Sequence, residues 1–246
     1  MNLFWLFGGV TVDVAATMTS MALPHQHVFK VHVLELLQVI CTAIREYCRR
    51  FQVSWPALDD LYKTSHGRHP LTLWTLESVR NLQVLMRYVR AAMIECQLRH
   101  ISIDKCQVVY NCIVRQRMVP RLEGLAVNKA ECLECVLYPR RAVVYPAWCA
   151  SPPPICVNDP KLANHADDRV AAAYDAAQSA ADAGHLHRAY QCYLVAKVGA
   201  WMHLSRPAIF PLVQHPFLEP AVHLVPERDE KKPSRPPRRR CVGWRL

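Results

Sequence analysis

Hydrophobic residues recur at helical spacing through the first half of the chain. In HVFKVHVLELLQVICTAIREYCRRF, residues 27–51, apolar side chains return every three or four positions. This periodicity is typical of an amphipathic helix with one buried face, which must end before Pro56. Ser54 is then the expected N-cap of a short helix that reaches Leu61. The stripe consists of Val33, Leu36, Leu37, Ile40, Ile44, Tyr47, Cys48 and Phe51.

A second apolar stripe follows in LTLWTLESVRNLQVLMRYVRAAMIECQLRH, residues 71–100. Its arginines fall outside the stripe, so the segment predicts one long amphipathic helix. A third helix is expected over residues 104–115 with Ser102 as its cap, although the β-branched residues there also allow a strand. Together these segments predict an N-terminal helical bundle over residues 25–118. The second stripe consists of Leu76, Val79, Leu82, Met86, Val89, Met93 and Cys96.

The pattern changes in residues 119–160, which contain seven prolines. Proline lacks the backbone N–H that a helix interior needs, so long helices are not expected in this segment. CVLY, residues 135–138, and AVVY, residues 142–145, leave room for short strands. The segment is therefore predicted to be a proline- and cysteine-rich insert between two helical regions.

Alanine-rich sequence brings the helical pattern back in residues 161–225. Alanine has the highest helix propensity, and Gly184 is placed to end one helix and to start the turn to the next. A helical hairpin is therefore expected here. Its residue spacing resembles one tetratricopeptide-type repeat, but a single copy cannot build a solenoid, so a plain hairpin is favoured.

The two ends of the chain differ from this helical interior. Residues 1–24 form an apolar leader that we expect to be poorly ordered. A cleaved signal peptide is less favoured, because Asp13 interrupts the apolar run and no Lys or Arg precedes Lys30. Residues 226–246 are basic, lack hydrophobic periodicity and are expected to be disordered. The sequence thus predicts a mainly α fold, a helical bundle with a proline- and cysteine-rich insert that contains short strands and could bind zinc.

Composition favours a reducing compartment and no membrane contact. The chain has eleven cysteines, an odd number, and most of them lie at apolar positions of helical segments. A disulfide framework of a secreted protein would instead be short and even-numbered. Beyond the leader, no segment has the uninterrupted apolar length of a membrane span. The formal net charge is +10, but residues 226–246 alone hold eight Lys or Arg against three Asp or Glu. DNA contact is therefore expected to be weak or indirect.

The segment ECLECVLYPRRAVVYPAWCASPPPIC, residues 131–156, holds the best candidate for a metal site. Cys132 and Cys135 have the C-x2-C spacing that lets two thiolates bind one zinc ion from a single turn. A structural zinc would be completed by two of Cys149, Cys156 and His165. The alternative is that these cysteines are incidental or small apolar core residues. Redox chemistry is disfavoured, because the strand-to-helix context of a thioredoxin-like site is missing.

Catalytic motifs are absent from the sequence. It has no glycine-rich phosphate loop, no nucleophile elbow and no HExxH motif, and it contains seven glycines in total. His66 and His69 lie in a loop beside Arg68, where a solvated histidine is more common than a metal ligand. We therefore expect a protein that is not an enzyme.

The basic tail predicts a nuclear localisation signal. KKPSRPPRRR is an extended, proline-containing run that can lay basic side chains into an acidic groove of a transport receptor. We expect the protein in the nucleus, with some in the cytoplasm; a merely solubilising tail is the alternative. The signal would be formed by Lys231, Lys232, Arg235, Arg238, Arg239 and Arg240.

The chain resembles a herpesvirus protein in several features. These are the segment HVFKVHVLELLQVI, the dispersed cysteines, the C-x2-C pair and the excess of 22 Arg over 8 Lys. The chain is similar to the small regulators of late gene expression of the beta- and gammaherpesviruses, as a general character over about residues 25–215. The resemblance implies a non-enzymatic adaptor in the host-cell nucleus, a subunit of a virus-encoded transcription pre-initiation assembly. Its partners would be other viral regulatory proteins and host RNA polymerase II. The alternative is a nucleic-acid-binding or tegument-like virion-assembly protein that uses the basic tail and exposed arginines.

Overall fold

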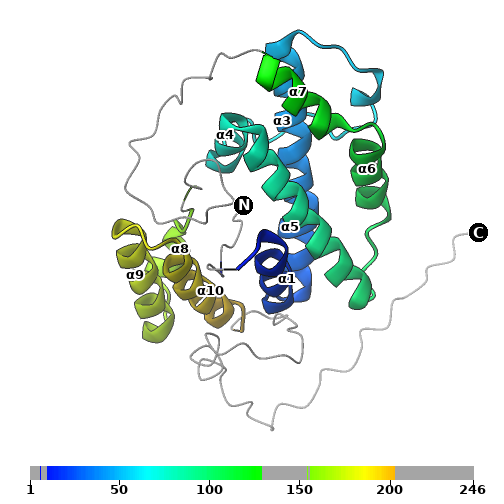
Figure 1. Ribbon diagram of the computed structural model, residues 1–246. Helices are drawn as coiled ribbons and strands as arrows, with labels where there is room; N and C mark the ends of the chain where they lie inside the picture. The colour runs from blue at the N-terminus through cyan, green and yellow to red at the C-terminus, as the bar shows by residue number, and fades with distance from the viewer. Residues whose placement is uncertain (1–5, 7–9, 129–153, 155, 203–246) are drawn as a thin grey trace, which may run out of the picture.

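The computed structural model describes Leu6, residues 10–128, Pro154 and residues 156–202 of the chain (Figure 1). All regular structure in these residues is helical, so the prediction of a mainly α protein is confirmed. The short strands expected at 135–138 and 142–145 lie outside the described residues. The elements are α1 (Val12–Ala22), α2 (His25–His27), the π-helix η1 (Val28–Glu35), α3 (Leu36–Phe51), the 3-10 helix η2 (Pro56–Leu58), α4 (Pro70–Glu77), α5 (Val79–Leu98), α6 (Asp104–Arg115), α7 (Met118–Asn128), α8 (Pro160–Ala163), α9 (Asp168–Asp182) and α10 (Leu186–Met202).

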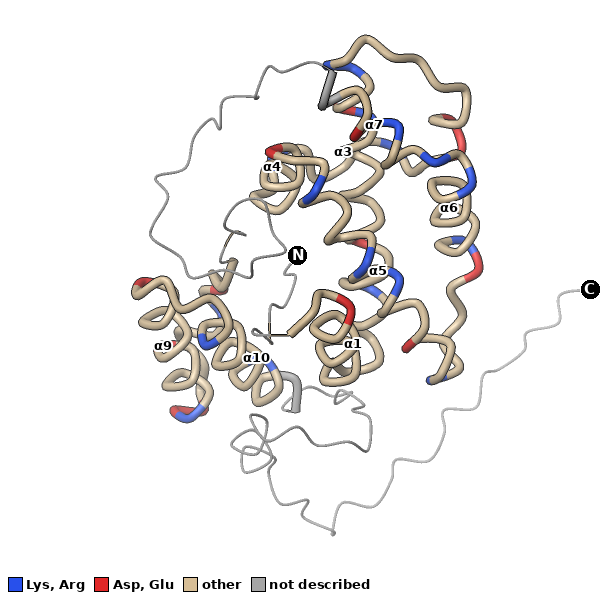
Figure 2. Tube along the Cα trace, viewed as in Figure 1, with Lys and Arg blue, Asp and Glu red and all other residues tan. Residues whose placement is uncertain are grey.

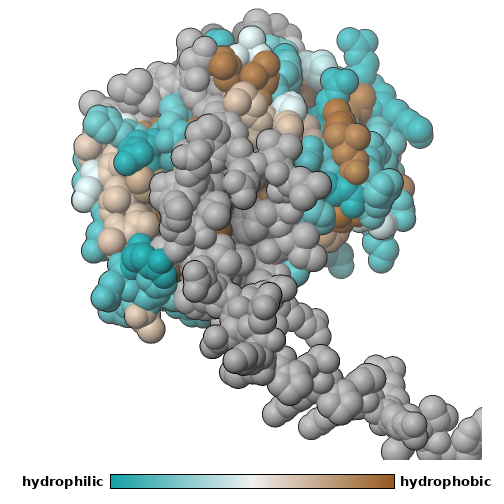
Figure 3. Space-filling model, turned by 90° about the horizontal axis from the view of Figure 1, so that it is seen from below, coloured by the Kyte–Doolittle hydropathy of each residue, from teal (hydrophilic) through white to brown (hydrophobic). Residues whose placement is uncertain are grey.

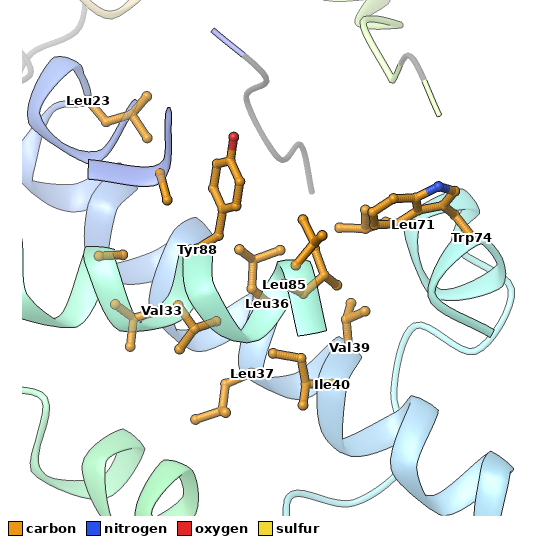
Figure 4. Close-up of a cluster of buried hydrophobic side chains, with 14 of the residues drawn as sticks. Leu23, Val33, Leu36, Leu37, Val39, Ile40, Leu71, Trp74, Leu85 and Tyr88 are labelled. Carbon is orange, nitrogen blue, oxygen red and sulfur yellow. The ribbon is translucent and has the colours of Figure 1, made fainter. Parts of the chain in front are cut away.

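Helices α3 and α5 form the centre of the bundle. α5 packs against α1, η1, α3, α4 and α7, and α3 also packs against η1, α4 and α7. Figure 4 shows aliphatic side chains of α3 and α5 close together, with Trp74 of α4 beside them. Leu36, Ile40 and Leu85 are fully buried. Removal of these apolar surfaces from water is the main force that holds the bundle together.

The helix predicted over residues 27–51 is a continuous helical run that changes geometry along its length. Its first part, Val28–Glu35, is a π-helix, in which the N–H of Leu36 donates to the carbonyl of Val31, five residues earlier. From Leu36 onward the run is α-helical, and it ends at Phe51, before the proline, as predicted. The apolar stripe is buried along most of the run.

The long helix predicted over residues 71–100 is in fact two helices. Ser78 has an extended backbone, and its Oγ accepts a hydrogen bond from Arg80 N at 3.1 Å. A serine N-cap stabilises a helix start, so α5 begins after the break although the apolar stripe continues across it. His69, which we expected to be solvated, caps α4: its Nδ1 accepts a hydrogen bond from Leu71 N at 3.1 Å.

The third predicted helix is confirmed as α6, and the alternative of a strand is wrong for this segment. Ser102 does not cap it, because its Oγ donates to the Asp104 carboxylate at 2.9 Å instead. The helical spacing of the apolar residues therefore outweighs the β-branched content of the segment. The buried side of α6 is formed by Cys106, Val109 and Ile113.

The expected boundary of the bundle at residue 118 is wrong, because α7 continues it to Asn128. α7 packs against α3, α5 and α6. Pro120 does not prevent this helix, since it lies in the first turn, where a backbone N–H would have no partner within the helix. The proline-rich insert is therefore shorter than the sequence pattern indicated.

The prediction that residues 1–24 are poorly ordered is wrong for much of its second half, which forms α1. Thr11 Oγ1 accepts a hydrogen bond from Val14 N at the start of this helix. Asp13 lies in the first turn, where a carboxylate is favourable beside the positive end of the helix dipole. The buried apolar residues of α1 lie on the helix that packs against α5.

Arg99, just beyond α5, holds the other end of α1. Its guanidinium donates to the carbonyls of Ser20, Met21 and Leu23 at 3.0, 3.0 and 2.6 Å. It also forms an ion pair with Glu95 at 2.6 Å, and the two side chains are only 5% and 13% exposed. A cation at the C-terminal end of a helix complements the helix dipole and satisfies carbonyls that lack a partner within the helix.

The segment between α3 and α4 is held onto α3 by an arginine. The short helix expected up to Leu61 is present only as the 3-10 helix η2. The guanidinium of Arg45, on α3, donates hydrogen bonds to three backbone carbonyls of this segment. The acceptors are the carbonyls of Leu58, Leu61 and Tyr62. These bonds satisfy backbone carbonyls that no longer helix accounts for, and the Leu58 carbonyl also accepts from Leu61 N at 3.1 Å.

The predicted C-terminal hairpin is confirmed as the pair α9 and α10, which pack along their lengths (Figure 1). Gly184 forms the turn between them with a left-handed φ of 74°, as its position indicated. Tyr190 of α10 binds the preceding segment: its hydroxyl accepts from Cys156 N at 2.8 Å and donates to the carbonyl of Pro154 at 3.1 Å. Residues 203–225, which we assigned to the same region, lie outside the described ranges.

Gln52→Gly is expected to raise the free energy of unfolding by about 0.5–1 kcal/mol. Gln52 ends α3 with a φ of 55°, a left-handed conformation that only glycine adopts without steric cost. Gln116→Gly is the matched control, because Gln116 ends α6 with a φ of −76°. There the same change should be neutral or destabilising. Urea denaturation of both variants checks this, and an equal gain at both sites would contradict the conformational explanation.

Candidate interaction surface

Exposed hydrophobic side chains are concentrated on three helices. Within the part of the chain that the structure describes, the large apolar residues with high exposure lie on α1, α5 and α6 or directly before α1. Leu98 is 71% exposed and Val108 is 67% exposed. Single exposed hydrophobic residues are ordinary, but their restriction to neighbouring helices is typical of a binding surface. We call this set the interaction surface: Val10, Val14, Met21, Ile94, Leu98, Val108 and Val114.

In Figure 1, α5 is drawn between α1 and α6. α1 packs on α5, and Arg87 of α5 forms an ion pair with Asp13 of α1 at 2.6 Å. Burial raises the pKa of Tyr110 on α6, and the charge of Arg90 on α5 opposes this. The exposed face of α5 is therefore bordered by α1, whereas α6 joins the bundle through its contacts with α7.

α5 presents a narrow exposed strip between its two neighbours. The strip residues follow one another at steps of seven and four, which places them on one face of an α-helix. The opposite face packs into the core through Leu82 and Leu85. Figure 3 shows hydrophobic groups at the surface of the molecule with hydrophilic groups around them. The strip consists of Arg80, Arg87, Ile94 and Leu98.

Positive charge surrounds these apolar residues. Figure 2 shows Lys and Arg along α5, α6 and α7 with few acidic residues between them. Residues 79–128 contain eight Lys or Arg against three Asp or Glu. Four exposed cations of this region pair with no carboxylate of the described residues: Arg90, Lys105, Arg115 and Arg117.

The sequence pattern did not single out this surface. Val14 and Met21 belong to the segment that we interpreted as a leader, so their place on a packed helix was not foreseen. Ile94 and Leu98 offered a signal that was missed: they are four residues apart and lie outside the predicted buried stripe. Two large apolar residues on the polar side of an amphipathic helix indicate a second contact face.

Two histidines lie within the bundle as neutral imidazoles. Burial, with a smaller contribution from His27, lowers the pKa of His32 to about 3. Burial, followed by the charges of Lys197 and Lys30, lowers the pKa of His27 to about 4. The ring of His32 lies 6.3 Å from that of Tyr88. His32 is fully buried, whereas His27 is partly exposed, and the lowered pKa favours the uncharged imidazole in both.

The structure describes two of the five predicted zinc ligands. Cys156 is partly buried, and burial raises its pKa to about 11, which favours the thiol over the thiolate that zinc requires. His165 lies before α9, where its Nδ1 accepts a hydrogen bond from Asp167 N at 3.1 Å. In the described ranges, no group of three His, Cys, Asp or Glu side chains is arranged to hold a metal ion. The remaining candidates lie outside these ranges: Cys132, Cys135 and Cys149.

Several other cysteines are apolar core residues. Burial raises the pKa of both Cys41 and Cys96 to about 12. It raises the pKa of Cys48 to about 11. A buried, protonated thiol is a poor nucleophile and a poor metal ligand. At these three positions the packing role that we considered for cysteine accounts for the residue.

Purified protein is expected to contain about one zinc ion per chain, bound by Cys132 and Cys135 with two further ligands. The double variant Cys132→Ser, Cys135→Ser should lose that ion, because serine does not supply a soft thiolate. Elemental analysis measures the zinc content of the wild type and of the double variant. Cys48→Ser is the matched control, since Cys48 is a buried core thiol and should leave the zinc content unchanged. Folded wild-type protein that contains no metal would contradict the prediction.

Two further predictions concern localisation and membranes. The expected localisation signal, formed by Lys231, Lys232, Arg235, Arg238, Arg239 and Arg240, lies outside the described residues. One described helical run, His25–Phe51, is long and apolar enough to cross a membrane by length and composition. Most of its apolar residues are buried in the bundle, and a core helix of such a bundle has the same composition.

Comparison with known proteins identifies no relative of this chain. No protein-family model matches it, and no curated protein or solved structure is similar to it at a significant level. The interaction surface on α1, α5 and α6 is therefore the feature of the molecule on which a functional proposal can rest.

Proposed function

We propose that the chain is a non-enzymatic helical adaptor that binds other proteins through the interaction surface. The observation that carries this proposal is the restriction of the exposed large apolar residues to α1, α5 and α6. Interfaces between proteins combine an apolar centre with arginine, and both are present here. The bundle core behind α5 is closely packed, so the surface is held on a rigid support.

The biological setting of this adaptor rests on the sequence resemblance. We propose a subunit of a virus-encoded transcription pre-initiation assembly that supports late gene expression in the host-cell nucleus. Other viral regulatory proteins and host RNA polymerase II would be its partners. A non-catalytic bridging protein needs surfaces rather than a catalytic centre, and the exposed apolar residues supply one such surface.

Affinity purification from cells that express the protein tests the proposal. Wild type is compared with the variant Ile94→Gln, Leu98→Gln, which removes two exposed apolar side chains without entering the core. We expect specific companions with the wild type and their loss with the variant. The control Val53→Gln changes an apolar residue outside the interaction surface. An identical set of companions for wild type and the α5 variant would refute the adaptor proposal in this form.

A nucleic-acid-binding protein is the second candidate. The eight Lys or Arg of residues 79–128 and the basic tail favour it. Binding of this kind is dominated by phosphate contacts, so it should weaken steeply with salt. Fluorescence anisotropy with duplex DNA at physiological salt separates the two candidates: tight binding would support this second function, whereas an adaptor gives only weak binding.

Removal of the basic tail charge is expected to shift the protein toward the cytoplasm. The variant changes Lys231, Lys232, Arg238, Arg239 and Arg240 to Gln, which abolishes charge complementarity with an acidic transport receptor. Fluorescence microscopy of a large fusion protein measures the shift, because a small chain could enter nuclei passively. The control is Lys161→Gln with Arg188→Gln, which removes charges of α8 and α10. Nuclear accumulation of the tail variant would place the signal elsewhere.

A further inference from the structure

The exposed strip of α5 and its flanks also indicate the chemistry of the partner. We infer that the interaction surface binds an acidic, amphipathic segment of another protein, which lies along α5 between α1 and α6. This inference rests on the proposed adaptor function and adds the chemical class of the partner. It is carried by two observations on the described residues: the place of the apolar residues and the sign of the charge around them.

The place of the apolar residues fits an elongated partner. Ile94 and Leu98 are one helical turn apart on α5, so together they offer an apolar line about 6 Å long. On α6, Val114 is 51% exposed and adds a further apolar side chain to the interaction surface. A helix with apolar residues at steps of three and four can place one side chain on each of these positions.

The charge around this line is positive on the α6 side. Arg90, Lys105 and Arg115 are exposed and pair with no described carboxylate. On the α1 side Arg87 pairs with Asp13, and this ion pair is half exposed. A segment with Asp and Glu on its flanks would therefore find opposite charges beside the apolar contacts, and like charges would be repelled.

A protein segment fits these residues better than a nucleic acid. Phosphate contacts require cations alone and gain nothing from Leu98, which is 71% exposed, or from Ile94, which is 49% exposed. An acidic amphipathic segment uses both kinds of residue at once. Arginine next to exposed aliphatic side chains is also the composition that protein interfaces favour.

Peptide selection against the full-length protein tests the inference. Random peptides of about 15 residues, long enough for about four helical turns, are displayed on phage, selected, synthesised and measured by fluorescence anisotropy. We expect the selected peptides to be acidic, with apolar residues at steps of three and four. Their affinity should fall at least about tenfold for Ile94→Gln, Leu98→Gln and for Arg90→Glu, Arg115→Glu.

The control Lys161→Glu, Arg188→Glu reverses the same number of charges on α8 and α10 and should leave the affinity unchanged. Circular dichroism confirms that each variant keeps its helical content. Selected peptides that are neutral or basic, yet depend on Ile94 and Leu98, would overturn the acidic chemistry while leaving the adaptor function intact. Peptides that bind all variants equally would overturn this binding site. Duplex DNA or anionic vesicles that bind more tightly than any peptide, and lose affinity with the same arginines, would overturn the choice of a protein partner.

Discussion

Arg99→Met is expected to lower the free energy of unfolding by about 3 kcal/mol. The change removes donors from the carbonyls of Ser20, Met21 and Leu23 at the end of α1. It also leaves the carboxylate of Glu95, which is 13% exposed, without its cation. For a chain of this length the loss corresponds to a fall in melting temperature of about 6–12 °C. Thermal and urea denaturation followed by circular dichroism measure it.

A matched control separates the buried arginine from an exposed one. Arg87→Met removes the ion pair with Asp13, whose side chains are 52% and 65% exposed, so it should cost no more than about 1 kcal/mol. The double variant Arg99→Met, Glu95→Gln should be less destabilised than Arg99→Met alone, because no unpaired charge remains. Equal losses for Arg99→Met and Arg87→Met would contradict the role of Arg99 in holding α1.

Acidification from pH 7 to pH 5 is expected to lower the free energy of unfolding by about 3–4 kcal/mol through two histidines. In the folded chain the pKa of His27 is about 4 and that of His32 is about 3, against 6.5 for the unconstrained side chain. The unfolded chain therefore binds protons first as the pH falls below 6.5, and folding becomes less favourable. The loss continues until the pH reaches the pKa values of the folded chain. Urea denaturation at pH 7, 6 and 5 measures it.

The histidines can be separated from the carboxylates by their pH range. Interaction with Arg49 lowers the pKa of Glu46 to about 2, so the stability that this group provides is lost only below about pH 4.5. In the variant His27→Gln, His32→Gln the decrease between pH 7 and pH 5 should largely disappear. The exposed His100→Gln is the control and should keep the full decrease. An unchanged pH dependence in the double variant would contradict the assignment.

Helices that depend on local pattern were predictable from the sequence. The three- and four-residue spacing around Ile40 and Ile44 predicted the α-helical part of the long run, and Gly184 indicated the turn of the hairpin. The break at Ser78 was not predictable in this way, because serine is tolerated within helices and the apolar residues on its two sides stay in phase. A cap becomes evident only when the backbone conformation is known.

α1 shows why long-range contacts limit such predictions. Its apolar residues read as a leader because nothing nearby in the sequence could bury them. The partner surface is α5, and the arginine that holds the helix end is Arg99, more than 70 positions away along the chain. Packing over this distance leaves no local pattern in the sequence.

The candidate functional sites also differ in whether they depend on local sequence or on long-range packing. The C-x2-C pair of Cys132 and Cys135 is a local motif, so the sequence offered it at once. The interaction surface exists only after α1 and α6 have taken their places beside α5, because a residue such as Val108 counts as exposed only when its neighbours are known. About half of all residues in this sequence are apolar, so the sequence alone does not show which of them form a common exposed surface.

The π-helix at Val28–Glu35 has a consequence for insertions and deletions. Each π-type turn holds one residue more than an α-type turn, since its hydrogen bonds span five residues instead of four. Deletion of one residue here could be absorbed by a local change to α-helical bonds, so that α3 keeps its position on α5. In α5 the same deletion would rotate all following side chains by about 100° and bring Ile94 and Leu98 into the wrong orientation. Loss of one residue should therefore be tolerated in Val28–Glu35 and not in α5.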